Sequence, residues 1–178
     1  VQTCALPIYY MGVILILILL MNLALAYHLL YLQAAAASNT TAATGNKDQK
    51  NEFFHKATQL YEFAYRKCVE YGRRQQQQQP SAGNGVYGAY GYPRFAMIVL
   101  NNLGQIHRAE GDTAKKYESY LQDLLSVLNY VVYERDLLNN NSNSSSTSIS
   151  ILSPVEFDGL YRNVSTIILK DACCASAA

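Results

Sequence analysis

Apolar residues recur at helical spacing in three separate stretches of the chain. They fall three and four positions apart after Asn51, after Pro93 and after Asp112, with polar residues between them. Such spacing aligns apolar side chains along one face of an α-helix. The predicted inner faces consist of Phe53, Phe54, Ala57, Leu60, Tyr61, Ala64 and Cys68; Ala96, Val99, Leu100, Leu103 and Ile106; and Tyr117, Tyr120, Leu121, Leu124, Leu125, Leu128, Val131 and Val132.

Two further stretches are predicted to be helical for other reasons. Residues 9–37 are apolar on every side, so periodicity assigns them no face, and Val13 to Leu19 would also suit a buried strand. The good helix formers around that run favour a helix. Near the C-terminus, Pro154 suits the first turn of a helix. The chain is therefore predicted to be all-α, with about five helices arranged as antiparallel hairpins.

Low-complexity segments separate these helices. They are rich in Ser, Thr and Asn, or contain a glutamine run followed by Gly and Tyr, and we expect them to form flexible loops. Gly72 is expected to end its helix as a left-handed cap. The predicted organisation is a hairpin over 9–71 with an inserted loop at 38–50, a linker over 72–92, a second hairpin over 93–135, a loop over 136–153, a terminal helix over 154–172 and a tail over 173–178.

The first eight residues are set apart from the rest. Val1 to Ile8 reads Val-Gln-Thr-Cys-Ala-Leu-Pro-Ile, which resembles the conceptual translation of a common sequencing adapter. The chain also has no initiator methionine at position 1. We therefore leave residues 1–8 out of the fold prediction and expect that preceding protein sequence is missing.

Two segments of the chain are similar to each other. Asn22-Leu23-Ala24-Leu25-Ala26-Tyr27-His28 aligns with Asn102-Leu103-Gly104-Gln105-Ile106-His107, and Gly111-Asp112 follows the second segment. Ala57, Tyr61 and Ala64 add the spacing Ala-x-x-x-Tyr-x-x-Ala. Together these features resemble the tetratricopeptide repeat, a pair of antiparallel helices with Leu-Gly/Ala-x-x-Tyr in the first helix. Residues 20–71 and 97–130 would each form one repeat, although Lys116, Asp123 and His107 depart from the motif in the second.

The resemblance implies a non-catalytic scaffold that binds a protein or peptide on its first helices. Stacked hairpins bury a continuous core, and residues 154–172 would cap them. The C-terminal stretch from Phe157 to Cys173 also resembles algal proteins to which no activity is attached, so it supports the fold alone. The candidate contact residues are Asn22, Tyr27, Asn101, Asn102, Gln105 and His107.

Composition narrows the possible functions. A formal net charge of +1 gives no basic face for nucleic acid. The four cysteines, Cys4, Cys68, Cys173 and Cys174, form no Cys-x-x-Cys pair and no metal-ligand spacing with histidine. They favour a cytoplasmic or other reducing compartment. We predict no enzymatic activity, no cofactor and no metal; an enzyme would require catalytic residues in missing N-terminal sequence.

Three motifs suggest chemistry but lack its context. Gly83 to Gly88 fits G-x-G-x-x-G, yet polyglutamine precedes it where a phosphate-binding loop needs a strand. Glu52-x-x-His55 is half of a di-iron carboxylate motif that requires two such pairs. His28 and His107 lie in corresponding segments and could line a groove, but structural packing is the favoured interpretation.

The apolar N-terminal stretch leaves one alternative open. Residues 9–32 are long enough to span a bilayer, which would make the chain a single-pass membrane protein with a signal anchor and a helical soluble part. Asn22 and His28 interrupt the run, and no Lys or Arg flanks it to set topology. We therefore favour a fully buried helix packed on a preceding hairpin. Without that hairpin, it should expose an apolar patch.

Overall fold

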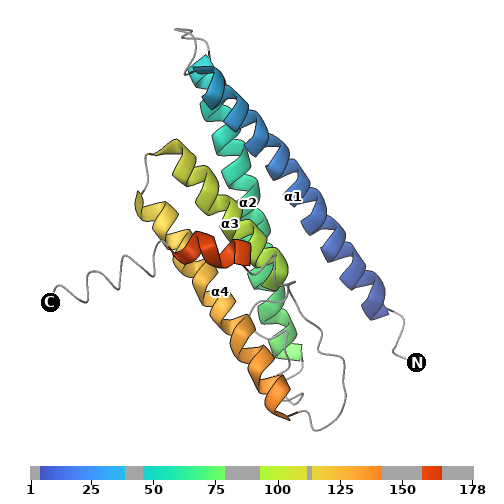
Figure 1. Ribbon diagram of the computed structural model, residues 1–178. Coiled ribbons are helices and arrows are strands. Elements are labelled where there is room, and N and C mark those ends of the chain that lie inside the picture. The colour runs from blue at the N-terminus through green and yellow to red at the C-terminus, as the bar shows by residue number, and fades with distance from the viewer. Residues whose placement is uncertain (1–4, 39–45, 79–92, 112–113, 142–157, 166–178) are drawn as a thin grey trace, which may run out of the picture. The chain divides into compact units, whose positions relative to one another are not determined.

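The computed structural model describes residues 5–38, 46–78, 93–111, 114–141 and 158–165. Within these ranges the chain is helical (Figure 1), with α1 (Ala5–Ser38), α2 (Asn46–Gln78), α3 (Pro93–Glu110) and α4 (Ala114–Asn141). Residues 158–165 form a further short helical segment. The described residues contain no strand, so the all-α prediction is confirmed, including the helical assignment of Val13 to Leu19.

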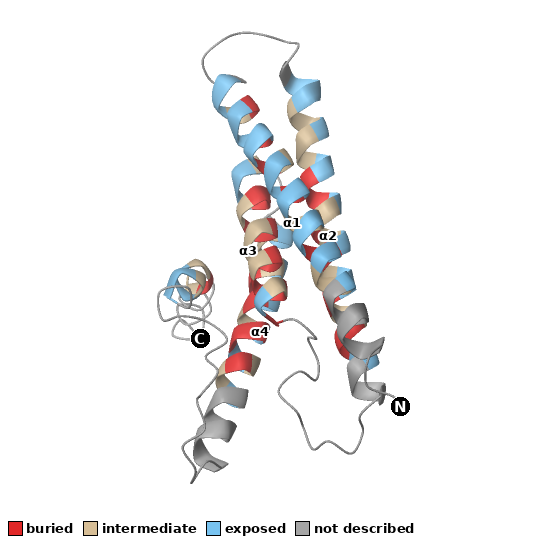
Figure 2. Ribbon diagram, turned by 90° about the vertical axis from the view of Figure 1, so that its right-hand side faces the viewer, coloured by how far each residue is buried: buried red, intermediate tan, exposed pale blue. Residues whose placement is uncertain are grey.

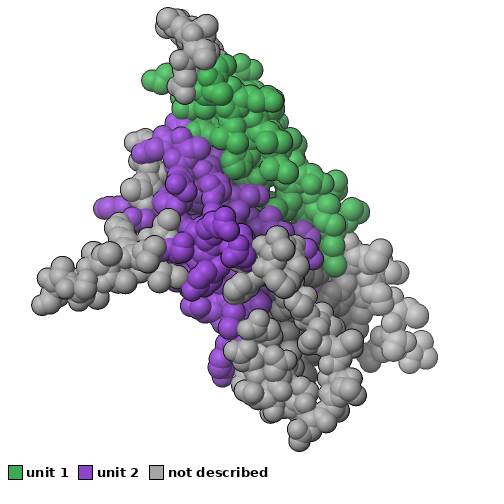
Figure 3. Space-filling model, viewed as in Figure 1, with its two compact units in different colours: residues 1–67 green, residues 68–178 purple. Residues whose placement is uncertain are grey.

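The chain divides into two compact units, Val1–Lys67 and Cys68–Ala178 (Figure 3). The first unit holds α1 and most of α2. The second holds the end of α2, together with α3, α4 and the segment 158–165. Each unit therefore contains one helical hairpin, α1 with α2 in the first and α3 with α4 in the second.

Aromatic contacts join the helices of the first hairpin. The ring of Tyr31 lies 5.6 Å from that of Phe54, and the ring of His28 lies 6.0 Å from that of Tyr61. Because the later residue of α1 meets the earlier residue of α2, the two helices run antiparallel, as predicted. On α2, the predicted inner positions Ala57, Tyr61, Ala64 and Cys68 are fully buried.

In the second hairpin, α3 and α4 pack along apolar faces that the spacing predicts well. All five predicted positions of α3 are fully buried: Ala96, Val99, Leu100, Leu103 and Ile106. On α4, Leu121, Leu124, Leu128 and Val131 are buried as expected, whereas the other predicted positions, Tyr117, Tyr120, Leu125 and Val132, are half-buried. Val127 is buried although it was not predicted to be. Gly111 has φ 73°, a left-handed conformation that glycine adopts readily, and it directly follows the end of α3.

Two helices extend further than the sequence suggested. The prediction that Gly72 ends its helix is wrong, because α2 begins at Asn46 and continues to Gln78. A glycine inside a helix costs only about 1 kcal/mol relative to alanine. The following glutamines are good helix formers, and Arg74 bonds Glu70 one turn back across Gly72. Similarly, α4 runs to Asn141. Residues 1–4, 39–45, 79–92, 112–113, 142–157 and 166–178 of the predicted segments lie outside the described residues.

Over residues 12–37, the part of α1 whose burial is described, burial is confined to one stripe (Figure 2), which consists mainly of Leu17, Ala24, His28, Tyr31 and Ala34. The expected apolar patch is present, whereas the expectation of a fully buried helix assumed a preceding hairpin and stays a prediction. The exposed large side chains are Leu15, Ile16, Ile18, Leu19, Leu23, Leu25, Leu29, Leu30 and Leu32. The physical reason is that α2 can cover only one side of a helix that is apolar on every side.

Candidate functional site

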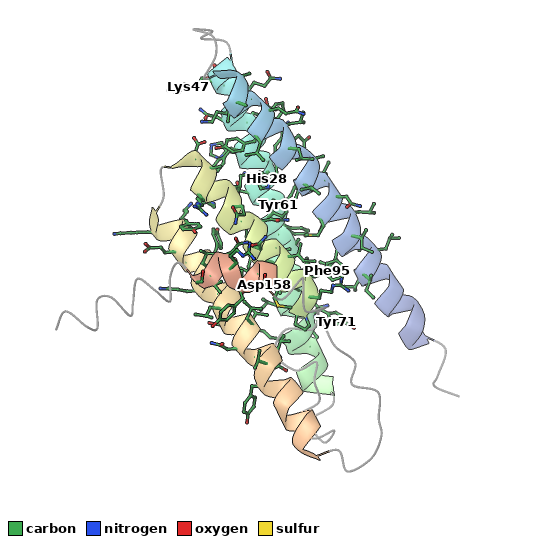
Figure 4. The ribbon with its side chains drawn as sticks, in the orientation of Figure 1. His28, Lys47, Tyr61, Tyr71, Phe95 and Asp158 are labelled. Carbon is green, nitrogen blue, oxygen red and sulfur yellow. The ribbon has the colours of Figure 1, made fainter. Side chains whose placement is uncertain are left out.

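A histidine of α1 packs against a tyrosine of α2 in the first hairpin. The Nδ1 atom of His28 lies 3.4 Å from the hydroxyl oxygen of Tyr61, and the two rings meet edge to face at 85° (Figure 4). Both side chains are buried. Burial lowers the pKa of His28 below its ordinary value, because desolvation disfavours the charged imidazolium. His28 is thus a neutral packing residue with one polar contact.

A similar pair lies in the second hairpin. His107 of α3 stacks on Tyr120 of α4, with ring centroids 5.3 Å apart and planes at 27°. Only 3% of His107 is exposed. Each hairpin thus places a histidine of its first helix against a tyrosine of its second. These contacts support the interpretation of His28 and His107 as structural residues rather than as groove-lining ones.

The lowered pKa of His28 predicts how stability depends on pH. In the unfolded chain the imidazole takes up a proton near its ordinary pKa of about 6.5, whereas in the folded chain it does so only at lower pH. Stability is therefore complete above about pH 6.5 and falls as the pH drops toward the lower folded pKa. Urea unfolding at pH 7.5 and 5.0 should show a lower midpoint at pH 5.0. The His28→Gln variant should lose part of this difference, and the matched variant His55→Gln, at an exposed position of α2, should retain it.

Small residues allow close approach of the helices at corresponding positions of the two hairpins. Ala24 on α1 is completely buried. On α3, a Cβ atom added to Gly104 would lie 3.1 Å from Cδ2 of Leu121, tighter than ordinary van der Waals contact. Gly104 thus admits α4 closely, and Ala24 fills a buried position of the first hairpin.

The buried residues of α2 and α4, the second helix of each hairpin, follow the same spacing. However, the alignment of α4 with α2 differs by one residue from the one that the repeat motif predicts. The motif aligned Lys116, Tyr120 and Asp123 with the buried stripe of α2. Lys116 and Asp123 are exposed, and Tyr120 is half-buried. Ala57, Tyr61, Ala64, Cys68 and Tyr71 are buried on α2; at the same spacing on α4, Leu121, Leu124, Leu128 and Val131 are buried after the half-buried Tyr117. The departures noted at Lys116 and Asp123 thus disappear, because apolar residues hold the inner positions.

The candidate contact residues on α1 differ in exposure. Asn22 is exposed, whereas Tyr27 is half-buried. The ring of Tyr27 lies 6.3 Å from that of Phe53 on α2, and Nζ of Lys56 lies 5.3 Å from its centroid. Tyr27 therefore helps to hold the hairpin together, and Asn22 is the more accessible of the two.

The candidate contact residues on α3 differ in how deeply they are buried. Asn101, Asn102 and Gln105 are half-buried. The side chain of Asn163, in the segment 158–165, donates a hydrogen bond of 2.6 Å to Oδ1 of Asn101. His107 is buried in the packing against α4, so its place among the surface contacts is corrected. The motif aligned it with a tyrosine, but its helical position turns it inward.

The described residues offer little reactive chemistry. They include no group of three or more His, Cys, Asp or Glu side chains that could hold a metal ion. Glu52 pairs with Lys56 on the surface of α2. Cys68 is a buried, free thiol, and desolvation raises its pKa to about 12, which suppresses the reactive thiolate. The segment 83–88 lies outside the described residues.

Comparison with known proteins identifies no relative. No family model matches the chain, and neither a curated protein nor a solved structure matches it. The resemblance to the tetratricopeptide repeat therefore stays a prediction, and it is supported only by the motif residues of this chain.

Proposed function

We propose that this chain is a non-catalytic protein–protein interaction scaffold built of tetratricopeptide-like hairpins. The observation that carries the proposal is the shared construction of its two hairpins. Each has a small buried residue on its first helix, Ala24 or Gly104, and an inner stripe with the same spacing on its second. Repeated hairpins of one construction are the unit from which helical solenoids are assembled.

A polar, half-buried face of α3 supplies the proposed contact surface. Asn102 and Gln105 are three residues apart and half-buried, so they share one face of the helix. Their amide groups can both donate and accept hydrogen bonds, which suits an extended peptide with unpaired backbone groups. Asn101 is less available because Asn163 bonds to it. The segment 158–165 fits the proposed cap at this end of the repeats.

Selection of peptides from a random display library tests the proposal, because the library itself supplies the ligands. The library is selected against the full 178-residue chain, and affinities are measured by fluorescence anisotropy. The double variant Asn102→Ala/Gln105→Ala should weaken the selected peptides about tenfold or more, because two bonded amides each contribute on the order of 1 kcal/mol. The control variant Gln122→Ala, on the exposed side of α4, should bind normally. Equal affinity for both variants would contradict this contact surface.

Exposure on α1 favours a second candidate function, a membrane anchor. The most apolar 18-residue stretch of Gly12–Ala37 has a mean hydropathy of 2.5. Only 17% of that stretch is buried. Its 26 residues extend about 39 Å at 1.5 Å per residue, more than the hydrocarbon core of about 30 Å requires. A spanning helix would account for the large aliphatic side chains that α2 leaves exposed.

The hairpin itself opposes that alternative. Lys50 and Lys56 of α2 lie over the rings of Tyr31 and Tyr27, so charged groups accompany α1 along the hairpin. Each charge at the centre of a bilayer costs at least about 3 kcal/mol, so α1 could span only after separating from α2. Carbonate extraction of vesicles mixed with the full chain distinguishes the two functions. Release favours the hairpin, and retention in the pellet favours the anchor.

A further inference from the structure

The exposed face of α1 contains a seven-residue repeat of apolar positions. Positions that alternate three and four residues apart form the contact seam of a coiled coil. On α1 the residues Leu15, Ile18, Asn22, Leu25, Leu29 and Leu32 follow this alternation through three successive repeats, and each is exposed. They include only one polar residue. The seam lies roughly 140° around the helix from the stripe that contacts α2, at 100° per residue, so both faces can be covered at once.

Asn22 indicates which occupant fits this seam. It stands at a first position of the repeat, in line with Leu15 and Leu29, where a single buried asparagine specifies register. In a parallel pair of identical helices, Asn22 faces Asn22 of the other copy, and each amide can donate to the carbonyl oxygen of the other. In an antiparallel pair over the same span, Asn22 would face Leu25 and lose hydrogen bonds. The seam is therefore complementary to itself in parallel orientation.

The seam offers a modest apolar area. Its five aliphatic side chains, Leu15, Ile18, Leu25, Leu29 and Leu32, are 40–58% exposed. At roughly 120 Å² of apolar area for each such side chain, the seam of one helix presents on the order of 300 Å². Two copies thus bury about 600 Å² along the seam, the size of a weak, transient interface. Helix α1 also contains no Asp, Glu, Lys or Arg that would oppose the pairing.

We propose that α1 pairs in parallel with α1 of a second copy of this chain through the seam from Leu15 to Leu32, with Asn22 facing Asn22. The pairing uses a surface that the proposed peptide site on α3 does not share. It also gives the exposed aliphatic face of the first hairpin a specific occupant.

Two adjacent leucines provide a matched test. Leu29 lies in the seam and Leu30 lies beside it, and they are 52% and 40% exposed. Sedimentation equilibrium of the full chain should give a dimer. The Leu29→Glu variant should raise the dissociation constant at least about 100-fold, because it buries two unpaired carboxylates, whereas Leu30→Glu should raise it less than about tenfold. Far-UV circular dichroism of both variants checks that they remain helical.

A disulfide tests the register. Asn22→Cys should cross-link two copies under mild oxidation in a background with Cys4, Cys173 and Cys174 changed to serine, and Leu30→Cys should not. A monomeric full chain, equal effects of the two glutamate variants, or equal cross-linking at both positions would overturn the proposal. Equal loss of vesicle retention in both glutamate variants would assign the face to a membrane instead. Peptide binding at Asn102 and Gln105 is measured alongside and should survive Leu29→Glu, so the two proposals can fail independently.

Discussion

Replacing Tyr61 with alanine is expected to cost about 3–5 kcal/mol of unfolding free energy, the range for removal of a large aromatic side chain from a core. Tyr61 is fully buried on the inner face of α2 and meets His28 of α1. The hairpin has few large side chains with which to fill the cavity, since Ala57 and Ala64 flank Tyr61 on the same stripe. Urea unfolding followed by circular dichroism measures the loss, and hydrogen exchange should locate it in α1 and α2.

The Tyr61→Phe variant separates the ring from its hydroxyl group. It keeps the buried aromatic area and removes the contact of 3.4 Å with Nδ1 of His28, which is long for a hydrogen bond. We therefore expect a loss of about 1 kcal/mol or less. If Tyr61→Phe cost as much as Tyr61→Ala, the hydroxyl rather than the ring would hold the hairpin together.

Periodicity predicts a buried face where apolar and polar positions contrast. On α2 and α3 the predicted positions Ala57, Ala64, Leu100 and Leu103 are all buried, because their spacing places them on the face that packs against the partner helix. Helix α1 offers no such contrast. Leu17 is 1% exposed and its neighbour Ile16 is 53% exposed, although both are large aliphatic residues. Only contact with α2 distinguishes them, and one sequence does not reveal that contact.

The ends of helices and the register of α4 were predicted less well. Gly72 is a local signal for a helix end, but the glutamines that follow and the pair of Arg74 with Glu70 continue the helix. In α4, the motif placed Tyr120 in line with Tyr61 because both are tyrosines. The packing instead places Leu121 there, against Gly104. Chemical identity thus misled the alignment by one residue, whereas apolar spacing had already included Leu121.

The contact surface shows a related limit. Motif alignment selected His107, but its position on α3 turns it toward α4, where it stacks on Tyr120. Asn101 was a contact candidate, but it is half-buried, and its bond to Asn163 joins segments 62 residues apart in sequence. Such long-range pairs follow from the tertiary fold and leave no local pattern. Asn102 and Gln105 are half-buried as well, and they remain the proposed contacts on α3.

Replacing Gly104 with leucine is expected to destabilise the second hairpin by about 2–4 kcal/mol, through overpacking at the contact of α3 with α4. Even a Cβ atom at this position would lie 3.1 Å from Cδ2 and 3.6 Å from Cγ of Leu121, and 3.9 Å from Cδ2 of Tyr117. A longer side chain must therefore displace Leu121 or separate the helices. The Gly104→Ala variant should change stability by less than about 1 kcal/mol, because the gain in helix propensity offsets the tight contact.

A double-mutant cycle with Leu121 shows whether close approach is the reason for glycine. Leu121→Ala alone should cost about 2–5 kcal/mol, since Leu121 is fully buried and its removal leaves a cavity. In the double variant the new leucine occupies that cavity, so the combined loss should be smaller than the sum by about 1–3 kcal/mol. Urea unfolding of the four proteins gives this coupling energy. Additive losses would mean that Gly104 and Leu121 act independently, and the close helix contact on which the repeat-like construction of the second hairpin depends would be wrong.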